Sequence, residues 1–221
     1  MHRVLDGLVD LLGRVVSPAR CAGCDADLRH GRAFCAACVS TLVRAGNPDP
    51  QKLAMFVYGG AIAEALRRFK FDDRPDLASA LLAGIHPHLA DLSKAAVDIV
   101  VPVPLHPARL VERGYNQAAL LARPLSRRLG LPCLSRALRR PVATARQTDL
   151  SGPARAANVD RAFVAADPVR LAGRVVLLVD DVETTGSTLA ACGRALLGGG
   201  ARAVRTLVVA RADLARGART P

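Results

Sequence analysis

Tryptophan is absent from this 221-residue chain, which contains only two tyrosines and five phenylalanines. Its core must therefore be built mainly from leucine, valine and alanine. Lysine is also scarce, with 3 residues against 28 arginines, and the net charge is +12. This excess is typical either of an arginine-rich surface in water or of an anionic partner, such as nucleic acid or a phosphorylated small molecule. Because no dense basic run with interleaved aromatics occurs, the charge favours DNA binding only weakly.

Long apolar runs are also missing. No run of about 18 uninterrupted apolar residues occurs, so the sequence predicts no transmembrane helix. The N-terminal segment MHRVLDGLVDLLGRVV carries Asp6, Asp10 and Arg14 within its apolar pattern and has no small-residue cleavage site, unlike a signal peptide. Its apolar residues lie at helical spacing and predict a short amphipathic helix. We therefore expect a cytoplasmic protein without membrane contact.

Four of the six cysteines lie in the segment CAGCDADLRHGRAFCAAC, at Cys21, Cys24, Cys35 and Cys38. Two Cys-x-x-Cys pairs that are separated by ten residues match a tetrahedral four-cysteine Zn²⁺ site. Two disulfides are the alternative, which a reducing compartment disfavours. We expect structural zinc in a module over residues 1–46, because so short a segment could hardly bury a core without metal.

The remaining chain alternates predicted strands and helices. Residues 47–51 (NPDPQ) are interpreted as a linker to a second domain over residues 52–221. Strands are expected at 53–60, 98–104, 173–180 and 201–211, and helices at 61–71, 76–90, 116–129 and 187–197, with a kink or break at Pro124. Residues 136–161 are polar and rich in arginine, and are expected to form a long mobile loop. This alternation predicts an α/β fold with a mainly parallel sheet flanked by helices.

The segment Val175–Leu189, VVLLVDDVETTGSTL, places two adjacent acids directly after an apolar run. Paired carboxylates at the carboxyl end of a buried strand repel each other, and are costly there unless a ligand binds them. In a parallel sheet, ligands bind at this end of the strands. The residues that follow offer backbone N–H groups and hydroxyls at a helix start, which suits one phosphate: Thr184, Thr185, Gly186, Ser187 and Thr188. An acid pair beside a phosphate cradle indicates a site for a ribose 5-phosphate.

This segment resembles the phosphoribosyl-pyrophosphate signature of type I phosphoribosyltransferases. The segments PVPLHPARLVERGYNQAALLA and RQTDLSGPARAANVDRAF, with the cysteine pairs before them, resemble the ComF family of bacterial proteins over nearly the whole chain. That resemblance implies a zinc ribbon joined to a type I phosphoribosyltransferase-like domain. It also implies an association with natural transformation and DNA uptake.

The resemblance further implies roles for individual residues. Asp180 and Asp181 would hold the ribose 2′ and 3′ hydroxyls of phosphoribosyl pyrophosphate, directly or through Mg²⁺, and Thr184 to Thr188 would hold the 5-phosphate. Three groups of residues would serve the pyrophosphate: the loop with Leu105, His106 and Arg109; Arg113; and a flexible loop with Gln147, Arg155 and Asn158. Each has an ordinary structural alternative, such as a solvated loop residue for His106 or an N-cap for Asn116. Lys70 could face the site, but a lysine that extends to water from a helix end is the simpler interpretation.

Glu183 departs from the signature, which usually has an apolar residue at this position. A carboxylate about 5 Å from the phosphate would repel it by roughly 3 kcal/mol at an effective dielectric constant near 20. We therefore expect Glu183 to point to solvent or to Mg²⁺. The first hypothesis is Mg²⁺-dependent phosphoribosyl transfer to an unidentified acceptor. The second is a non-catalytic, ligand-regulated module that binds single-stranded DNA or DNA-processing proteins.

Overall fold

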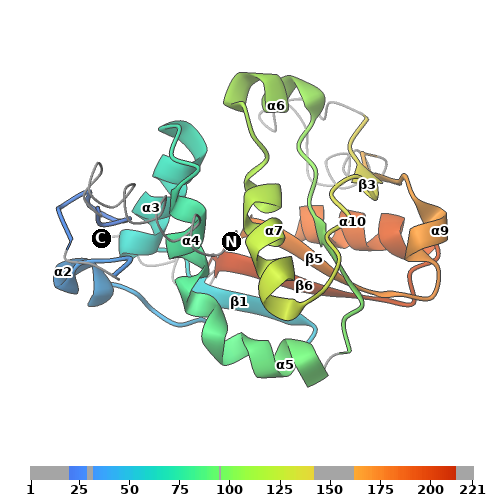
Figure 1. The fold of residues 1–221 in the computed structure, drawn as a ribbon, viewed down its shortest axis with the longest axis horizontal. Coiled ribbons are helices and arrows are strands. Elements are labelled where there is room, and N and C mark those ends of the chain that lie inside the picture. Colours follow the sequence, from blue (N-terminus) through green and yellow to red (C-terminus); the bar gives the residue numbers. More distant parts are fainter. Residues whose placement is uncertain (1–19, 29–31, 95, 142–161, 213–221) are drawn as a thin grey trace, which may run out of the picture.

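Four parallel strands form the central sheet of the computed structural model, which describes residues 20–28, 32–94, 96–141 and 162–212 (Figure 1). The strand order is β1-β6-β5-β2. The strands are β1 (Lys52–Val57), β2 (Ile99–Pro102), β5 (Val175–Glu183) and β6 (Ala203–Arg211). All three strand pairs are parallel, which confirms the predicted sheet.

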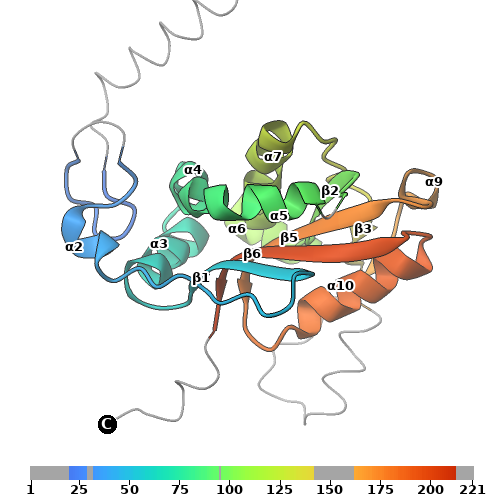
Figure 2. The same ribbon diagram turned by 90° about the horizontal axis from the view of Figure 1, so that it is seen from below.

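Helices cover both faces of this sheet (Figure 2). One face packs against α3 (Gly60–Phe71), α4 (Leu77–Leu81), the 3-10 helix η1 (Leu82–His88), α5 (Leu89–Lys94) and α7 (Gln117–Leu129). The other packs against α10 (Ser187–Gly198). Shorter elements complete the description: α2 (Ala36–Val39), α6 (Pro107–Arg113), α9 (Pro168–Leu171) and the antiparallel pair β3 (Leu138–Arg139) and β4 (Val164–Ala165).

The apolar run of β5 is explained by this two-sided cover. All five residues from Val175 to Val179 are at most 5% exposed. Side chains alternate between the two faces of a strand. Accordingly Val175, Leu177 and Val179 belong to the core beneath α3 and α7, whereas Val176 and Leu178 belong to the core beneath α10. Because both of its faces are covered, a central parallel strand has a continuous apolar sequence.

β5 is longer than the sequence predicted. It continues through Asp180 and Asp181 to Glu183, because β6 runs alongside as far as the pair Glu183–Arg211. On the other side, pairing with β2 ends at Pro102 opposite Val179. The acids therefore lie on an extended strand and not in the loop after it.

The helices differ from the prediction in three places. The expected helix over 76–90 is divided into α4, η1 and the start of α5, with Pro87 inside the 3-10 segment. In contrast, α7 continues through Pro124 without a break, since Leu121, Ala122 and Leu125 are fully buried against the sheet and hold the helix in place. Helix α6 was not predicted.

Some predicted features lie outside the described residues, namely the N-terminal amphipathic helix and residues 142–161 of the expected loop. The first residues of that loop form β3. The cysteine segment packs at one end of the molecule against α3, and Cys21, Ala22 and Phe34 share a core with that helix. The division into domains at residues 46 and 52 stays a prediction. None of the helices in the described ranges is long and apolar enough to cross a membrane.

Candidate functional site

The four predicted zinc ligands converge in the structure. The Sγ atoms of Cys21, Cys24, Cys35 and Cys38 all lie within 4.8 Å of one another. Those of Cys24 and Cys35 are 3.7 Å apart. Tetrahedral Zn²⁺ with bonds of about 2.3 Å to sulfur needs an edge of about 3.8 Å between sulfur atoms. The cluster therefore fits a structural zinc ion.

Backbone donors prepare one of these thiols to bind a cation. The N–H of Cys35 donates to Cys21 Sγ at 3.3 Å. Burial alone would raise the pKa of Cys21, but this bond and those from the backbone of Cys24 and Gly23 lower it to about 6. Because a thiolate is the form that binds metal, the backbone stabilises the binding state of this ligand.

Gly23 lies where the cysteine cluster meets α3. A Cβ atom at this position would lie 2.8 Å from the Cβ of Ala61 and 2.9 Å from Cys38 Sγ. Both contacts are shorter than real Cβ atoms tolerate. The glycine therefore lets the first turn approach the helix and the second cysteine pair at the same time.

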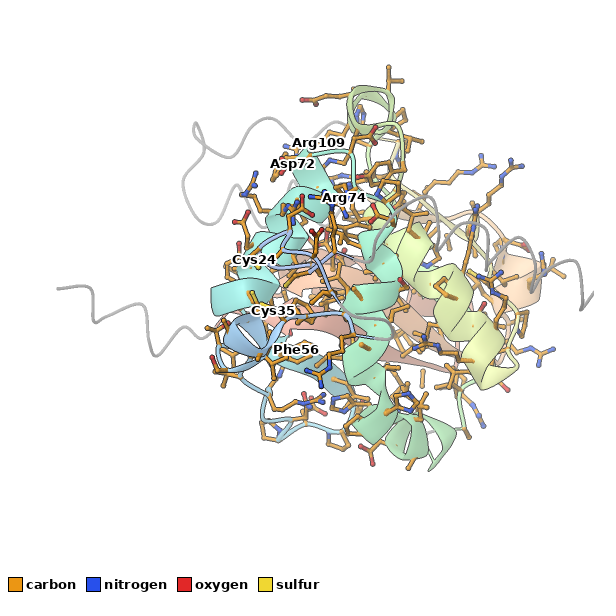
Figure 3. The ribbon with its side chains drawn as sticks, turned by 60° about the vertical axis from the view of Figure 1, so that its left-hand side comes forward. Cys24, Cys35, Phe56, Asp72, Arg74 and Arg109 are labelled. Carbon is orange, nitrogen blue, oxygen red and sulfur yellow. The ribbon has the colours of Figure 1, made fainter. Side chains whose placement is uncertain are left out.

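The module, which is the cysteine segment from Arg20 to Leu42 as far as it is described, lies beside α3 (Figure 3). Ion pairs hold it against the end of this helix and the residues that follow. Asp25 Oδ1 lies 2.9 Å from Arg68 Nη2 and 3.0 Å from Arg74 Nη1. Hydrogen bonds from these two arginines lower the pKa of Asp25. At the other end of the helix, the N–H of Ala61 donates to Thr41 Oγ1 at 2.9 Å.

The second site is at the carboxyl edge of the sheet, where Asp180 and Asp181 end the apolar part of β5. Asp181 is 7% exposed and Asp180 is half-buried. The N–H of Asp181 donates to Asp180 Oδ1 at 2.9 Å. The two carboxylates are therefore adjacent acids with little access to water, as the sequence predicted, and their mutual repulsion is costly unless a ligand or a cation compensates it.

Lys70 supplies a counter-ion for Asp181. Its Nζ lies 2.9 Å from Asp181 Oδ1, and the side chains are 23% and 11% exposed. The interpretation of Lys70 as a helix-end lysine that extends to water is therefore wrong. Its sequence position, at the end of α3 and 111 residues before its partner, gives no local signal for this contact.

Asp180 lies in a different environment from Asp181. Burial, and next the charge of Asp181, raise the pKa of Asp180 to about 7. The N–H of Asp181 and the positive charges of Lys70 and Arg140 act in the opposite direction. Arg140 directly follows β3, and its guanidinium lies 5.2 Å from the ring centroid of Phe163. Burial, and next the positive charge of Arg109, lower the pKa of Arg140. Two positive charges, those of Lys70 and Arg140, thus act on the acid pair.

The predicted phosphate loop connects β5 to α10. Gly186 is the N-cap of α10 and has a φ of 75°, in the left-handed region that favours glycine. The hydroxyls of Thr185 and Ser187 lie 3.0 Å apart, and both residues are exposed. The loop thus presents hydroxyls and the N-terminal N–H groups of a 12-residue helix to the same region.

The position of Glu183 corrects the sequence prediction. Its carboxylate is 14% exposed and accepts a hydrogen bond from Arg211 Nε at 2.5 Å. Glu183 and Arg211 are register partners on β5 and β6. Glu183 therefore points to a neighbouring strand and not to solvent. Its negative charge next to the phosphate loop is compensated by a paired arginine.

The predicted pyrophosphate residues lie on and around α6. Leu105 is half-buried and Arg109 is exposed. His106 is the N-cap of α6 and accepts a hydrogen bond from the N–H of Ala108 at its Nδ1, at 3.2 Å. Asn116 is the N-cap of α7, as its structural alternative predicted, and also donates to the carbonyl of Val103 at 3.0 Å.

Arg113 lies at the end of α6 beside a cavity of about 530 Å³. Its guanidinium is 5.0 Å from the ring centroid of Phe71, and that ring is 68% exposed. Lys70 also lines this cavity, so the space next to Arg113 reaches the lysine that contacts Asp181. Asp180 and Asp181 do not line this cavity, so Lys70 is the residue that connects it to the acid pair. The flexible-loop residues Gln147, Arg155 and Asn158 lie outside the described residues.

Comparisons with known proteins give one family match and several relatives of this chain. The phosphoribosyl transferase domain family matches residues 115–220. DNA utilization protein YhgH of Escherichia coli (strain K12) is 35% identical over 198 residues, which cover 86% of this chain and 83% of that protein. Competence protein F of Haemophilus influenzae is 32% identical over 175 residues, which cover 76% and 74% of the two chains. Among solved structures, an adenine phosphoribosyltransferase is 20% identical with a TM-score of 0.44, over 70% of this chain and 79% of that chain.

The matched domain and the parallel sheet define a phosphoribosyltransferase-like protein, in which the acid pair precedes the loop that is predicted to bind phosphate. The four-cysteine cluster precedes this domain, and the match to YhgH covers 86% of the chain. The chain belongs to the ComF family.

Proposed function

We propose that this protein binds phosphoribosyl pyrophosphate at the carboxyl edge of its sheet and transfers the phosphoribosyl group to an acceptor that is still unidentified. One observation carries the proposal. Two poorly exposed carboxylates on β5 lie beside a loop of hydroxyls and a left-handed glycine that begins α10. The membership of the phosphoribosyltransferase-like ComF family supports the same donor.

The loop from Thr184 to Thr188 would hold the 5-phosphate of the donor. Backbone N–H groups at the start of α10 have no partner within the helix and favour an anion. The hydroxyls of Thr185 and Ser187 can donate to phosphate oxygens, while Arg211 compensates the charge of Glu183. In our proposal, the phosphate therefore accepts hydrogen bonds from this loop and is repelled little by the Glu183 carboxylate.

The acid pair would hold the ribose. Asp180 and Asp181 would accept hydrogen bonds from the 2′ and 3′ hydroxyls, directly or by holding Mg²⁺, whose preferred ligands are carboxylate oxygens and water. When it is bound, Mg²⁺ would neutralise negative charge on the pyrophosphate leaving group. Before any ligand binds, Lys70 occupies one oxygen of Asp181.

The departing pyrophosphate would be held by arginines. Arg109 on α6 and Arg113 beside the cavity are the proposed residues, together with the loop that begins at Leu105 and His106. Guanidinium groups bind phosphate oxygens in pairs and stabilise charge that develops on a leaving group. Stacking on Phe71 restricts the Arg113 guanidinium and reduces the entropy lost when it binds. Gln147, Arg155 and Asn158 stay predictions for a loop that covers the diphosphate.

Calorimetry with the donor and Mg²⁺ tests the binding step. Wild-type protein should show saturable, Mg²⁺-dependent binding, and the double variant Asp180→Asn with Asp181→Asn should show none. Asp91→Asn is the matched control, because this exposed acid lies on α5, which precedes β2 and so lies at the opposite edge of the sheet. Equal binding by the double variant and the wild type would show that the site is elsewhere.

A second experiment separates transfer from binding. Purified protein is incubated with donor, Mg²⁺ and one nucleobase at a time, and pyrophosphate is measured. Release that requires both a particular base and Asp180 identifies the acceptor. Donor binding without release for any base favours a ligand-regulated module.

Binding of single-stranded DNA is a second candidate function. It is supported by the net charge of +12 and by the names of relatives, which refer to DNA utilization and competence. Electrostatic binding of this kind should weaken steeply as salt rises, with little sequence preference. A salt titration with labelled single-stranded DNA tests this candidate, and no binding at low salt would remove it.

A further inference from the structure

Helix α3 contacts both of the sites described above. Its first residues and Arg68 contact the cysteine module, whereas Lys70 near its end contacts Asp181 on β5. Residues two positions apart on a helix point to nearly opposite sides. Arg68 and Lys70 therefore connect one helical turn to two different parts of the molecule.

The carboxylate of Asp25 makes the ion pairs between the module and this part of the chain. Asp25 Oδ1 contacts Arg68 Nη2 at 2.9 Å and Arg74 Nη1 at 3.0 Å, one residue before Lys70 and the other after it. Arg68 is 12% exposed and also lies 3.5 Å from the carbonyl oxygen of Ala22, which is in the first cysteine turn. Asp25 thus holds both sides of the segment that carries Lys70.

The conformation of Asp25 is set by the same turn that presents the cysteines. Its N–H donates to the carbonyl of Cys21 at 2.8 Å, and its φ is 63°, in the left-handed region. Such a conformation persists only where surrounding contacts enforce it. Closure of the cysteine cluster therefore also decides where the Asp25 carboxylate lies.

The last residues of α3 also have specific contacts on the side of the sheet edge. Lys70 Nζ contacts Asp181 Oδ1, and the carbonyl of Phe69 accepts a hydrogen bond from the hydroxyl of Tyr115 at 2.6 Å. Phe71 stacks beneath Arg113. Lys70 and Phe71 thus contact two residues that we assign to the donor site, Asp181 and Arg113, and Tyr115 fixes the backbone of the preceding residue.

We propose that Asp25 is a positioning residue for the donor site, which acts by holding Lys70 against Asp181. The proposal extends the proposed function to the cysteine module. Lys70 orients the Asp181 carboxylate, and the Asp25 contacts keep the last turn of α3 in the place from which Lys70 reaches it. The cysteine module then contributes to the donor site through α3, although no contact between its described residues and the acids is seen.

The substitution Asp25→Asn tests this without a change to any cysteine. Asp72→Asn is the matched control, because Asp72 pairs with Arg67 on the same helix end at 2.9 Å but is exposed and belongs to a surface network with Glu64. Both variants should retain about one zinc per chain. Asp25→Asn should increase amide hydrogen exchange at Phe69, Lys70 and Phe71 about tenfold, and Asp72→Asn should leave it unchanged.

Donor affinity in two backgrounds shows whether the effect passes through Lys70. Asp25→Asn should weaken Mg²⁺-dependent donor binding about fivefold to tenfold in the wild type, and should have no further effect in a Lys70→Met background. Lys70→Arg should restore part of the affinity that Lys70→Met loses. An equal loss from Asp25→Asn in both backgrounds would overturn the proposal.

The two proposals can fail separately. If the wild type does not bind the donor, the proposed function is wrong, and hydrogen exchange alone decides the positioning role. Raised exchange at Lys70 in Asp25→Asn then supports it. Unchanged exchange, with zinc retained, overturns it whether or not the donor binds.

Discussion

The cysteine module and the carboxyl edge of the sheet are both candidate binding sites, but they are assembled in different ways. The four sulfur atoms come from one segment, Cys21 to Cys38, in which a turn carries the first pair and the start of the short helix α2 carries the second. The proposed edge site draws its residues from distant parts of the chain, from Lys70 to Arg211. They lie on α3, α6, β5, α10 and β6. A site built from one short segment can be recognised by spacing alone. A site built from distant segments depends on the fold that joins them.

The two sites also differ in how their negative charge is compensated. The thiol cluster converges within 4.8 Å, and a metal ion is the counter-charge that its geometry fits. At the sheet edge, Asp181 pairs with Lys70 and Glu183 pairs with Arg211. The module should therefore depend on metal for its stability, and the edge site should depend on ion pairs for its binding properties.

Removal of one zinc ligand should have the largest effect. Cys35→Ser should lose the metal and loosen the module, because structural zinc contributes on the order of 10 kcal/mol in zinc-finger peptides. Metal analysis should fall from about one zinc per chain to none, while hydrogen exchange in β5 and β6 stays slow. Cys133→Ser is the control and should keep its zinc. Native protein that contains two disulfides and no metal would contradict the conclusion that the module depends on zinc for its stability.

A methyl group at Gly23 should perturb the module next most strongly. In Gly23→Ala, the new Cβ meets Ala61 and Cys38 Sγ at less than 3.0 Å, so the variant should lose about 1–3 kcal/mol of stability. At Gly46, nothing lies within 4 Å of the added atom, so Gly46→Ala should be neutral. Thermal unfolding and competition for zinc with a chelator provide the measurement. Equal behaviour of the two variants would mean that the module is not tightly packed on α3.

Loss of the Arg211 charge should weaken the edge site without loss of the fold. Arg211→Met leaves the Glu183 carboxylate uncompensated beside the phosphate loop, and we expect about a tenfold rise in the Kd of the donor, equal to about 1.4 kcal/mol. Adding Glu183→Gln should restore most of the affinity, because the repelling charge is then also removed. Calorimetry on the single and double variants checks this. If the double variant binds the donor no better than Arg211→Met, the ion pair does not act by compensating repulsion between Glu183 and the phosphate.

The smallest expected effect concerns the stability of the acid pair. The pKa of Asp180 is raised to about 7 from an ordinary value of 3.8, so the native state binds more protons than the unfolded state between these values. Its contribution to stability therefore falls as the pH rises from about 4 to 7. Without ligand, Asp180→Asn should unfold about 2–4 °C above the wild type at pH 8, equal to about 1 kcal/mol. The difference should be smaller at pH 5.5. Calorimetric scans that show the same difference at both pH values would contradict this account.

Several features could be predicted from short stretches of sequence. The spacing of the cysteines predicted their convergence, the run VVLLV predicted a buried central strand, and Gly186 predicted the turn before α10. The family and its parallel sheet followed from the same motifs. In each case the physical cause is local: a turn and a short helix, side chains that alternate between two covered faces, or one left-handed backbone position.

The tertiary structure decided the partners of the charged residues. The sequence alone did not indicate that Lys70 reaches Asp181 or that Arg211 faces Glu183, because these pairs form only after β5 is placed beside β6 and α3 is packed on the sheet. Pro124 illustrates the same limit, since burial of Leu121 and Leu125 keeps α7 continuous where local propensity predicts a kink or break. Local spacing can specify a turn or a strand, but the free energy of an ion pair depends on distance and burial, which exist only in the folded chain.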